Sequence, residues 1–320
     1  MPTILSKLLG VRYPILNAPM TPHAGGALAR AVAQSGAFGM LGFDEDETAD
    51  NLRLQIGLIR EGDMPLAFGI GLVSWVIDRR PELIDLALRA RPKLVSLSFG
   101  DPTAYVARFH DAGILVASQV QSKRWAEMAL SAGVDILVAQ GTEAGGHTGE
   151  VGTLPLLQLV LELAGNTPVI AAGGIATGRG LAAVLAAGAC GAWIGTPFLA
   201  AAEARTNAVA QARVVASSET DTILTNAFDR VQHKPWPCEF KGRALRNSFT
   251  ELWDKAAVPE SAEKGFADAR THRDYDIANI YAGQSVGLIR GTDSAAAIVE
   301  RIVLQADACL RSVDTEQLSP

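Results

Sequence analysis

Cysteines are few in this chain, and they are scattered. Cys190, Cys238 and Cys309 are odd in number, lie far apart and form no CxxC pair. Such a set cannot supply a disulfide framework, and it lacks the spacing of a metal site, so we expect no metal. It is typical of reduced thiols, and we therefore expect a cytoplasmic protein.

Long apolar runs and an excess of positive charge are also missing. No run reaches the roughly 18 residues of a membrane span, and the first residues lack the charged and apolar regions of a signal peptide. The chain carries 34 acidic and 28 basic residues, for a net charge of −6. An acidic surface disfavours nucleic acid and anionic membranes, so neither is an expected partner. An oligomer is compatible with this composition.

Apolar residues, by contrast, are abundant. They make up 48% of the chain, against 19% that are charged, as in a well-packed globular protein. Short apolar runs recur along the first 200 residues or so, and their near-continuous apolarity is typical of parallel strands covered on both faces. Eight runs are candidate strands: 14–18, 37–41, 65–70, 94–97, 114–118, 135–139, 168–171 and 191–194.

Amphipathic segments separate these runs, and several end at a glycine, which is a common helix C-terminal signal. Eight alternating β/α units favour a TIM (β/α)8 barrel. A doubly wound sheet usually stops near six strands, and no GxGxxG follows the first run here. Helices are expected at 28–34, 48–60, 81–90, 103–111, 122–132, 154–163 and 178–187.

The regular alternation ends after Thr196. A helix is expected at 198–206, and residues 208–276 should form a mainly helical elaboration, because a structureless loop of that length is rare in a compact domain. Residues 294–310 have the spacing of a closing amphipathic helix. We therefore divide the chain into a barrel, 1–207 and 277–320, and an elaboration, 208–276, that flanks or caps the barrel mouth.

One loop after the sixth run concentrates the chemistry. Residues 138–149 hold four glycines, Glu143 and His147. Glycines let the backbone approach a ligand closely, and a histidine among them can act as a base or an acid. A flexible glycine-rich turn with a surface histidine is the plain alternative. Of the other histidines, His23 could face the pocket or cap a turn, and His110 should face solvent.

A second set of small residues follows the seventh and eighth runs. Gly173, Gly174, Gly195 and Thr196 stand where TIM barrels often bind phosphate through backbone N–H groups. Alternatively, these glycines serve only tight turns at the barrel corners. A sugar phosphate or a flavin mononucleotide (FMN) would fit such a site. The opposite loops favour the flavin, because 18–20 offer amides and an apolar surface and Gln140 offers a side-chain amide.

With these residues in view, the chain resembles the nitronate monooxygenase family, formerly called 2-nitropropane dioxygenases. The resemblance covers most of the chain and implies a TIM barrel with FMN held non-covalently at its mouth, with His147 facing the flavin. The matching motifs are Asn17-Ala18-Pro19-Met20, Gly141-Thr142-Glu143-Ala144-Gly145-Gly146-His147, Ala171-Ala172-Gly173-Gly174-Ile175, Gly195-Thr196, Lys241-Gly242-Arg243-Ala244-Leu245-Arg246-Asn247 and Ala282-Gly283-Gln284-Ser285-Val286-Gly287.

The resemblance and the loops together predict the site. The catalytic residue is His147, and Met20, His147 and Ser285 are expected to contact substrate. Gly71 departs from relatives that often place an asparagine there, so a contact to the cofactor is missing. The expected cofactor-binding residues are Asn17, Ala18, Pro19, Met20, Gly71, Gln119, Gln140, Ala144, Gly145, Gly146, Ala172, Gly173, Gly174, Gly195, Thr196 and Gln284.

The resemblance also implies the reaction. We expect FMN-dependent oxidation of alkyl nitronates, and by extension nitroalkanes, by oxygen to carbonyl compounds and nitrite. His147 would serve as the base or hold the anion. Two alternatives stay open: a flavin-dependent enoyl-acyl-carrier-protein reductase using NADPH, which shares the motif at 143–147, and a flavin-binding protein without dedicated turnover.

Overall fold

The computed structural model describes residues 3–43, 45–62 and 66–312. Eight parallel strands form one sheet in the order β1-β9-β8-β6-β5-β4-β3-β2. An isolated parallel bridge between Leu16 and Phe38 joins β1 to β2 and brings the sheet round to a nearly closed barrel. The strands are β1 (Ile15–Asn17), β2 (Gly39–Gly42), β3 (Phe68–Val73), β4 (Leu94–Ser98), β5 (Leu115–Val120), β6 (Ile136–Gln140), β8 (Val169–Ala172) and β9 (Gly191–Ile194).

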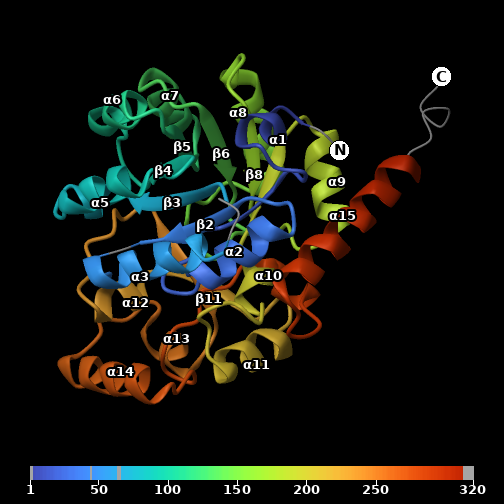
Figure 1. The fold of residues 1–320 in the computed structure, drawn as a ribbon. Coiled ribbons are helices and arrows are strands. Elements are labelled where there is room, and N and C mark those ends of the chain that lie inside the picture. Colours follow the sequence, from blue (N-terminus) through green and yellow to red (C-terminus); the bar gives the residue numbers. More distant parts are fainter. Residues whose placement is uncertain (1–2, 44, 63–65, 313–320) are drawn as a thin grey trace.

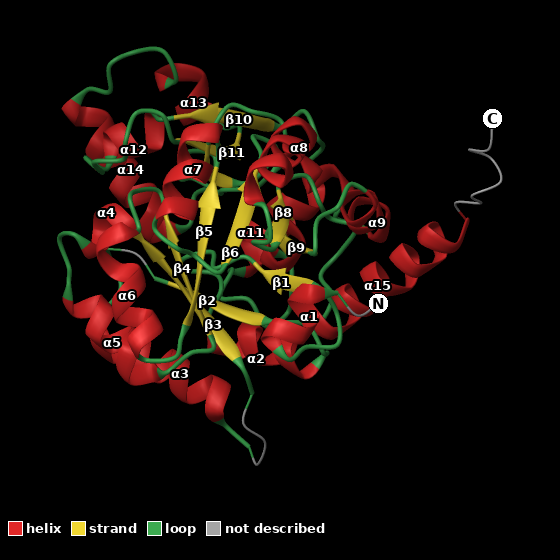
Figure 2. Cartoon of the chain, turned by 90° about the horizontal axis from the view of Figure 1, so that it is seen from above, coloured by secondary structure: helices red, strands yellow, loops and turns green. Residues whose placement is uncertain are grey.

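The predicted TIM barrel and its eight strands are therefore confirmed, although most strand boundaries shift by one to three residues. The third strand begins at Phe68, and residue 65, where it was predicted to begin, lies outside the described residues. Helices surround the strands in Figure 2. They are α2 (Gly26–Gln34), α3 (Ala49–Arg60), α4 (Ser74–Ile77), α5 (Glu82–Ala90), α6 (Thr103–Asp111), α7 (Lys123–Ser131), α8 (Thr153–Ala164) and α9 (Gly178–Ala186).

The inside of the barrel is packed with side chains and closed at one end. Phe38, Met40 and Trp193 belong to a buried cluster between the strands. Leu5 from α1 (Ile4–Leu9) joins this cluster. A Cβ added at Gly191 would lie 2.4 Å from Leu5 Cδ2, so the glycine makes room for α1 beneath β9. Since α1 covers the amino end of the barrel interior, a ligand is expected at the carboxyl ends of the strands.

The helix predicted at 198–206 is wrong in extent. The structure has only α10 (Thr196–Leu199) there. The chain then turns, because Ala201 forms an isolated parallel bridge with Asp293 and Ala202 N donates to Asp293 O at 2.9 Å. This pairing leads into α15 (Ala295–Ser312), the predicted closing helix, which packs against α9 and α2.

Residues 208–276 contain four helices. They also contain two strands, which the sequence analysis did not predict. The elements are α11 (Ala208–Ala216), β10 (Thr222–Thr225), α12 (Ala227–Val231), β11 (Lys241–Leu245), α13 (Ser248–Trp253) and α14 (Glu260–His272). The four helices gather at one end of the barrel in Figure 1. Strand β11 pairs antiparallel with both β10 and β7 (Gly146–Thr148), so this segment is joined to the glycine loop after β6.

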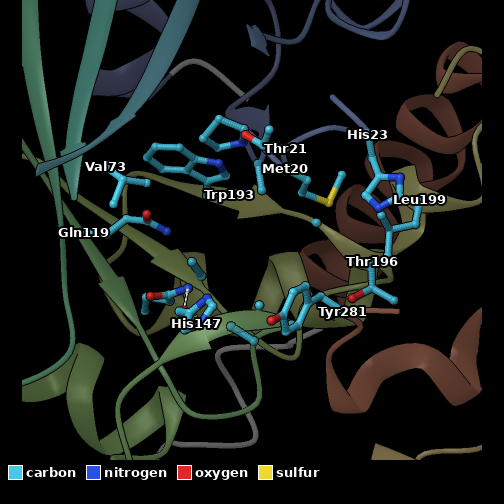
Figure 3. Close-up of a pocket in the computed structure, with 18 of the residues that line it drawn as sticks. Met20, Thr21, His23, Val73, Gln119, His147, Trp193, Thr196, Leu199 and Tyr281 are labelled. Atoms are coloured by element: carbon cyan, nitrogen blue, oxygen red, sulfur yellow. Dashed lines mark hydrogen bonds between the residues drawn. The ribbon is translucent and has the colours of Figure 1, made fainter. Parts of the chain in front are cut away.

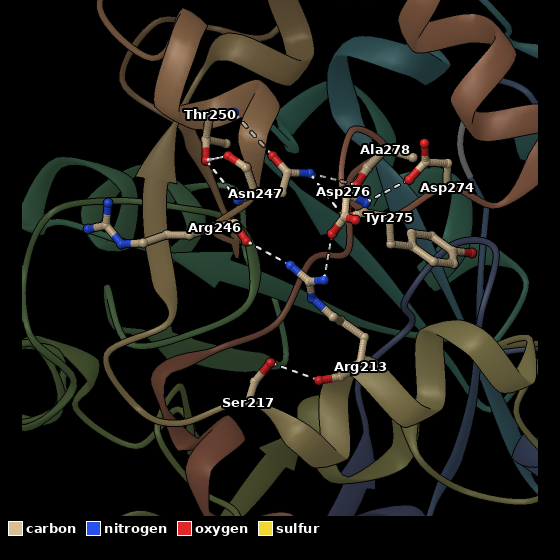
Figure 4. A network of polar contacts seen from close by, with 9 residues as sticks. All are labelled: Arg213, Ser217, Arg246, Asn247, Thr250, Asp274, Tyr275, Asp276 and Ala278. Atoms are coloured by element: carbon tan, nitrogen blue, oxygen red, sulfur yellow. Dashed lines mark hydrogen bonds and ion pairs between the residues drawn. The ribbon is translucent and has the colours of Figure 1, made fainter.

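Polar contacts fix the elaboration from within (Figure 4). Asn247 accepts from Thr250 N at 3.1 Å to cap α13, and its Nδ2 donates to Ala278 O at 2.9 Å. Arg213 on α11 forms an ion pair of 2.8 Å with Asp276. Each helix in the described ranges is too short or too polar to span a bilayer.

Candidate active site

A cavity of about 480 Å³ opens at the carboxyl ends of the strands (Figure 3). This volume lies within the range of small-molecule and cofactor sites. In Figure 3, Met20 and Trp193 lie across the cavity from His147 and Tyr281. Most of the predicted site residues line it: Ala18, Pro19, Met20, Gln119, Gln140, Ala144, Gly145, Gly146, His147, Ala172, Gly173, Gly174, Gly195, Thr196 and Ser285.

Three predicted cofactor-binding residues are not brought to the cavity wall. Asn17 is fully buried and ties β1 to β2, because its side chain donates to Met40 O at 2.9 Å and accepts from Met40 N at 2.8 Å. At Gly71 an added Cβ would lie 2.4 Å from Pro19 Cγ, so the Pro19 ring occupies the space of a side chain. Gln284 is exposed, and its backbone N–H donates to Glu143 O at 2.9 Å.

The glycine loop after β8 lies against the glycine loop after β6 at the cavity wall, and the loop after β9 adds a hydroxyl there. Gly173 and Gly174 have φ values of 103° and 71°, which disfavour residues with a Cβ. A Cβ at Gly173 would lie 2.9 Å from Gly141 O and 3.1 Å from Ala144 N. Thr196 Oγ1 accepts from Gly283 N at 2.9 Å, so the hydroxyl proton can still be donated to a ligand.

The opposite part of the cavity is apolar but carries one notable donor. Trp193 Nε1 is buried and has no hydrogen-bond partner within the described part of the chain, and Trp193 lines the cavity. Such an atom is expected to donate to a ligand. Gln140 behaves differently from our expectation, because its Oε1 accepts from Gln121 at 2.8 Å and its Nε2 donates to His147 O at 3.1 Å. Its amide therefore holds the backbone of His147.

His147 lies on β7 at the cavity wall, with its ring enclosed by other side chains. Its Nε2 is 3.0 Å from both carboxylate oxygens of Asp229. The indole of Trp236 stacks on the imidazole with 3.4 Å between ring centroids and 7° between planes. The ring of Tyr281 lies 5.5 Å away. The imidazole is thus oriented by a carboxylate and covered on one face by an aromatic ring.

Sequence reasoning missed Asp229, Trp236 and Tyr281. Two of them belong to the elaboration, and nothing in its polar, irregular sequence indicated which residues reach the mouth. Phe99 was also missed. It has φ 63°, an unusual conformation for a bulky residue, and it packs edge-on against Trp236 at 5.1 Å. Backbone outliers of this kind concentrate at functional sites.

Two titratable groups at the wall are held in one protonation state. Burial, followed by the charge of Asp229, raises the pKa of Tyr281 well above its usual value. Its hydroxyl therefore stays protonated and can donate. Burial, followed by the Arg205 charge, lowers the pKa of His23 to about 4. His23 is therefore neutral at pH 7, and its Nδ1 lies 3.0 Å from Thr206 Oγ1. In the described ranges no cluster of three or more His, Cys, Asp or Glu could hold a metal ion.

Comparison with known sequences gives consistent relatives. A nitronate monooxygenase of Metarhizium robertsii is 33% identical over 93% of this chain and 92% of that protein. A (3aS,4S,5R,7aS)-5-hydroxy-7a-methyl-1-oxo-octahydro-1H-indene-4-carboxyl-CoA dehydrogenase of Mycobacterium tuberculosis is 32% identical over 83% and 71%. Another protein of that organism, named as a putative monooxygenase, is 40% identical over 56% of this chain. The match covers only 45% of that protein's length.

Solved structures agree with the fold. FabK from Thermotoga maritima superimposes with a TM-score of 0.86 at 29% identity and covers 98% of both chains. Nitroalkane oxidase from Streptomyces ansochromogenes gives 0.81 at 27% identity, covering 97% and 99%. The family model for nitronate monooxygenase matches residues 76–305. The chain therefore belongs to the nitronate monooxygenase family of flavin-dependent oxidoreductases.

Proposed function

We propose that this protein uses FMN to oxidise alkyl nitronates, and by extension nitroalkanes, with oxygen to carbonyl compounds and nitrite. One observation carries the proposal: the glycine loops after β8 and β9 and His147 line the same cavity of about 480 Å³. A cofactor bound through its phosphate at those loops would have its ring within reach of the imidazole. Membership of a flavin-dependent family supports this placement.

The residues present fit FMN. Gly173, Gly174, Gly195 and Thr196 would hold the phosphate through N–H and O–H donors, as TIM-barrel loops after the last strands often do. Trp193 Nε1, buried without a protein partner in the described residues, would donate to a polar edge of the ring system. Bound FMN would supply the redox chemistry, exchanging electrons with the nitronate and with oxygen.

His147 would manage the proton and the negative charge of the substrate. With Nε2 donating to the carboxylate of Asp229, Nδ1 would be the acceptor of the neutral ring. With a neutral nitroalkane, the C–H bond beside the nitro group breaks, the electron pair stays on the substrate as the nitronate, and the proton moves to His147. With a preformed nitronate, the protonated ring holds the anion. Met20 and Ser285 are proposed to contact the substrate.

Two measurements test this function. The absorbance spectrum of the purified protein should show a flavin, and mass analysis of the material released on denaturation should identify it as FMN. Nitrite release and oxygen uptake with propyl nitronate should then be measured for the parent and His147→Ala. A colourless protein, or a variant that turns over as fast as the parent, contradicts the proposal.

A second candidate is oxidoreduction of an acyl thioester, of which enoyl-acyl-carrier-protein reduction by NADPH is one form. Two observations favour it: the mycobacterial relative named as a carboxyl-CoA dehydrogenase, and the bulky aromatic wall of the cavity, which includes Phe99, Trp193 and Trp236. Rapid anaerobic flavin reduction by NADPH, with turnover of a crotonyl thioester, would favour this candidate. A flavin-containing protein inactive in both assays would indicate binding without turnover.

A further inference from the structure

Asp229 and His147 are held by elements of one small sheet and its following helix, although they are 82 positions apart in sequence. Strand β7 carries His147 and pairs antiparallel with β11, where Gly242 lies opposite the histidine. Strand β11 also pairs with β10, and α12, which carries Asp229, begins directly after β10. The small sheet therefore fixes the helix that bears the carboxylate relative to the strand that bears the imidazole.

The side chains complete this arrangement. Both carboxylate oxygens of Asp229 lie 3.0 Å from His147 Nε2. An ionised carboxylate can only accept hydrogen bonds, so Nε2 must carry the proton. The exposed fractions of the two side chains are 8% for His147 and 7% for Asp229, so water competes little for this contact. Their electrostatic interaction is correspondingly stronger than it would be in bulk water.

The neighbours of the pair hold its geometry. Trp236 stacks on one face of the imidazole. Tyr281 lies beside the ring at 5.5 Å, and burial followed by the nearby charge of Asp229 raises its pKa, so its hydroxyl stays protonated next to the pair. Gly242 makes this possible, because a Cβ there would lie 2.6 Å from Tyr281 Cε1. Asp229, Trp236 and Tyr281 thus surround one imidazole.

We propose that Asp229 is the positioning residue for His147. It fixes the Nε2–H tautomer, orients the ring, and leaves Nδ1 as the nitrogen that takes a proton or, once protonated, holds an anion. The elaboration then acts as part of the active site and not merely as a cover over the mouth. The catalytic consequence rests on the proposed role of His147, whereas the tautomer can be observed without turnover.

The parent protein provides the first test. The chain has five histidines, so the ring nitrogens of protein labelled with ¹⁵N-histidine can be resolved by NMR and His147 assigned from a His147→Gln sample. At about pH 8.5, where histidines are mostly neutral, His147 should show the Nε2–H tautomer. An Nδ1–H tautomer overturns the proposal, and this result needs no Asp229 variant to fold.

The second test replaces the carboxylate. Asp229→Asn keeps the shape but offers either an oxygen or an NH₂ group, so the tautomers of His147 should become mixed. With a neutral nitroalkane such as nitroethane, kcat should fall roughly 10²-fold, and KM should change less than about threefold. The matched control is Asp135→Asn, because Asp135 Oδ2 lies 2.9 Å from His110 Nε2 in an exposed pair. Its kcat should stay within about twofold of the parent.

The outcomes separate the two proposals. If Asp229→Asn keeps the Nε2–H tautomer, Asp229 does not set it, and the positioning role is overturned whatever happens to kcat. An unchanged kcat beside a mixed tautomer equally overturns the catalytic consequence. If the tautomer changes as expected but the parent releases no nitrite, the positioning role stands and the proposed nitronate chemistry fails.

Discussion

Among the residues that the structure describes, two histidine–aspartate pairs lie at opposite ends of the barrel, and they differ in burial far more than in distance. At the mouth, His147 and Asp229 are 3.0 Å apart, with 8% and 7% of their side chains exposed. At the other end, His110 and Asp135 are 2.9 Å apart, with 39% and 30% exposed. Exposed pairs contribute little because water and salt screen them. A short contact alone therefore does not indicate function, whereas burial at a cavity wall does.

The second difference lies in what surrounds each pair. Asp135 Oδ2 also accepts from Val116 N at 2.7 Å, so it serves the start of a strand. Asp229 contacts His147, burial followed by the Asp229 charge raises the pKa of neighbouring Tyr281, and Trp236 covers the imidazole. The outer pair fastens a helix end to a strand, and the inner pair holds a ring at the cavity wall.

The largest expected effect tests the difference between the two histidines. His147→Gln should lower kcat for a neutral nitroalkane such as nitroethane roughly 10³-fold, because general acid–base groups contribute on this scale. His110→Gln removes the equivalent ring from the exposed pair and should leave kcat unchanged. Nitrite release measures both. Similar losses in the two variants would contradict the distinction between the pairs.

A second prediction compares glycines at the two ends. Gly173→Ala should weaken FMN binding about 100-fold, or about 2.7 kcal/mol, since the new Cβ would lie 2.9 Å from Gly141 O. Gly113 has a similar backbone, with φ 71°, but open space at its Cβ. Gly113→Ala should cost about 1 kcal/mol of stability and leave FMN affinity intact. Flavin fluorescence titration of the apoprotein distinguishes them.

A third prediction separates stacking on His147 from simple packing. Trp236 stacks on the imidazole, whereas Trp125 packs on Phe240 in the same aromatic cluster and bonds Glu239 at 3.1 Å. Trp236→Leu and Trp125→Leu should each cost about 1 kcal/mol of stability. Only the first should lower kcat, by about tenfold. Equal kcat values for the two variants would show that the stack does not matter for turnover.

The smallest effect concerns stability against pH. His23 has its pKa lowered to about 4 from 6.5, so the unfolded chain binds this proton more readily than the folded one. Stability should therefore fall as pH drops from 6.5 towards 4, by roughly 1–2 kcal/mol for a half-buried ring. Melting temperatures of His23→Gln should fall less over this interval than those of the parent, while exposed His272→Gln should match the parent. A parallel decline in His23→Gln would contradict this assignment.

The barrel itself could be predicted from local patterns. Each β/α unit can be recognised within about 25 residues, because apolar runs and helical periodicity indicate locally which residues are buried. The antiparallel pairing of β10 with β11 was not predicted, because it does not depend on local patterns. Its strand Lys241–Leu245 begins with a charged residue and contains a glycine and an arginine, and its pairing with β7 joins residues about a hundred positions apart. No local periodicity encodes such a partner.

The same limit applies to the site. Glycines at 173, 174 and 195 were recognisable because the count of strands placed them at the phosphate-binding loops. Asn17 and Gly71 were expected at the cofactor, yet one bridges two strands and the other makes room for Pro19. A motif gives the residue type at a position but not the direction of its side chain or the neighbour that fills the space.

The sequence by itself determined the class of fold, the glycine loops and the histidine at their edge, because each of these is encoded by residues close together in the chain. Only the tertiary structure decided that Asp229, Trp236 and Tyr281 meet at that histidine. Their meeting depends on antiparallel pairing of β7 with β11 and on burial of α12, and both are decided by long-range packing.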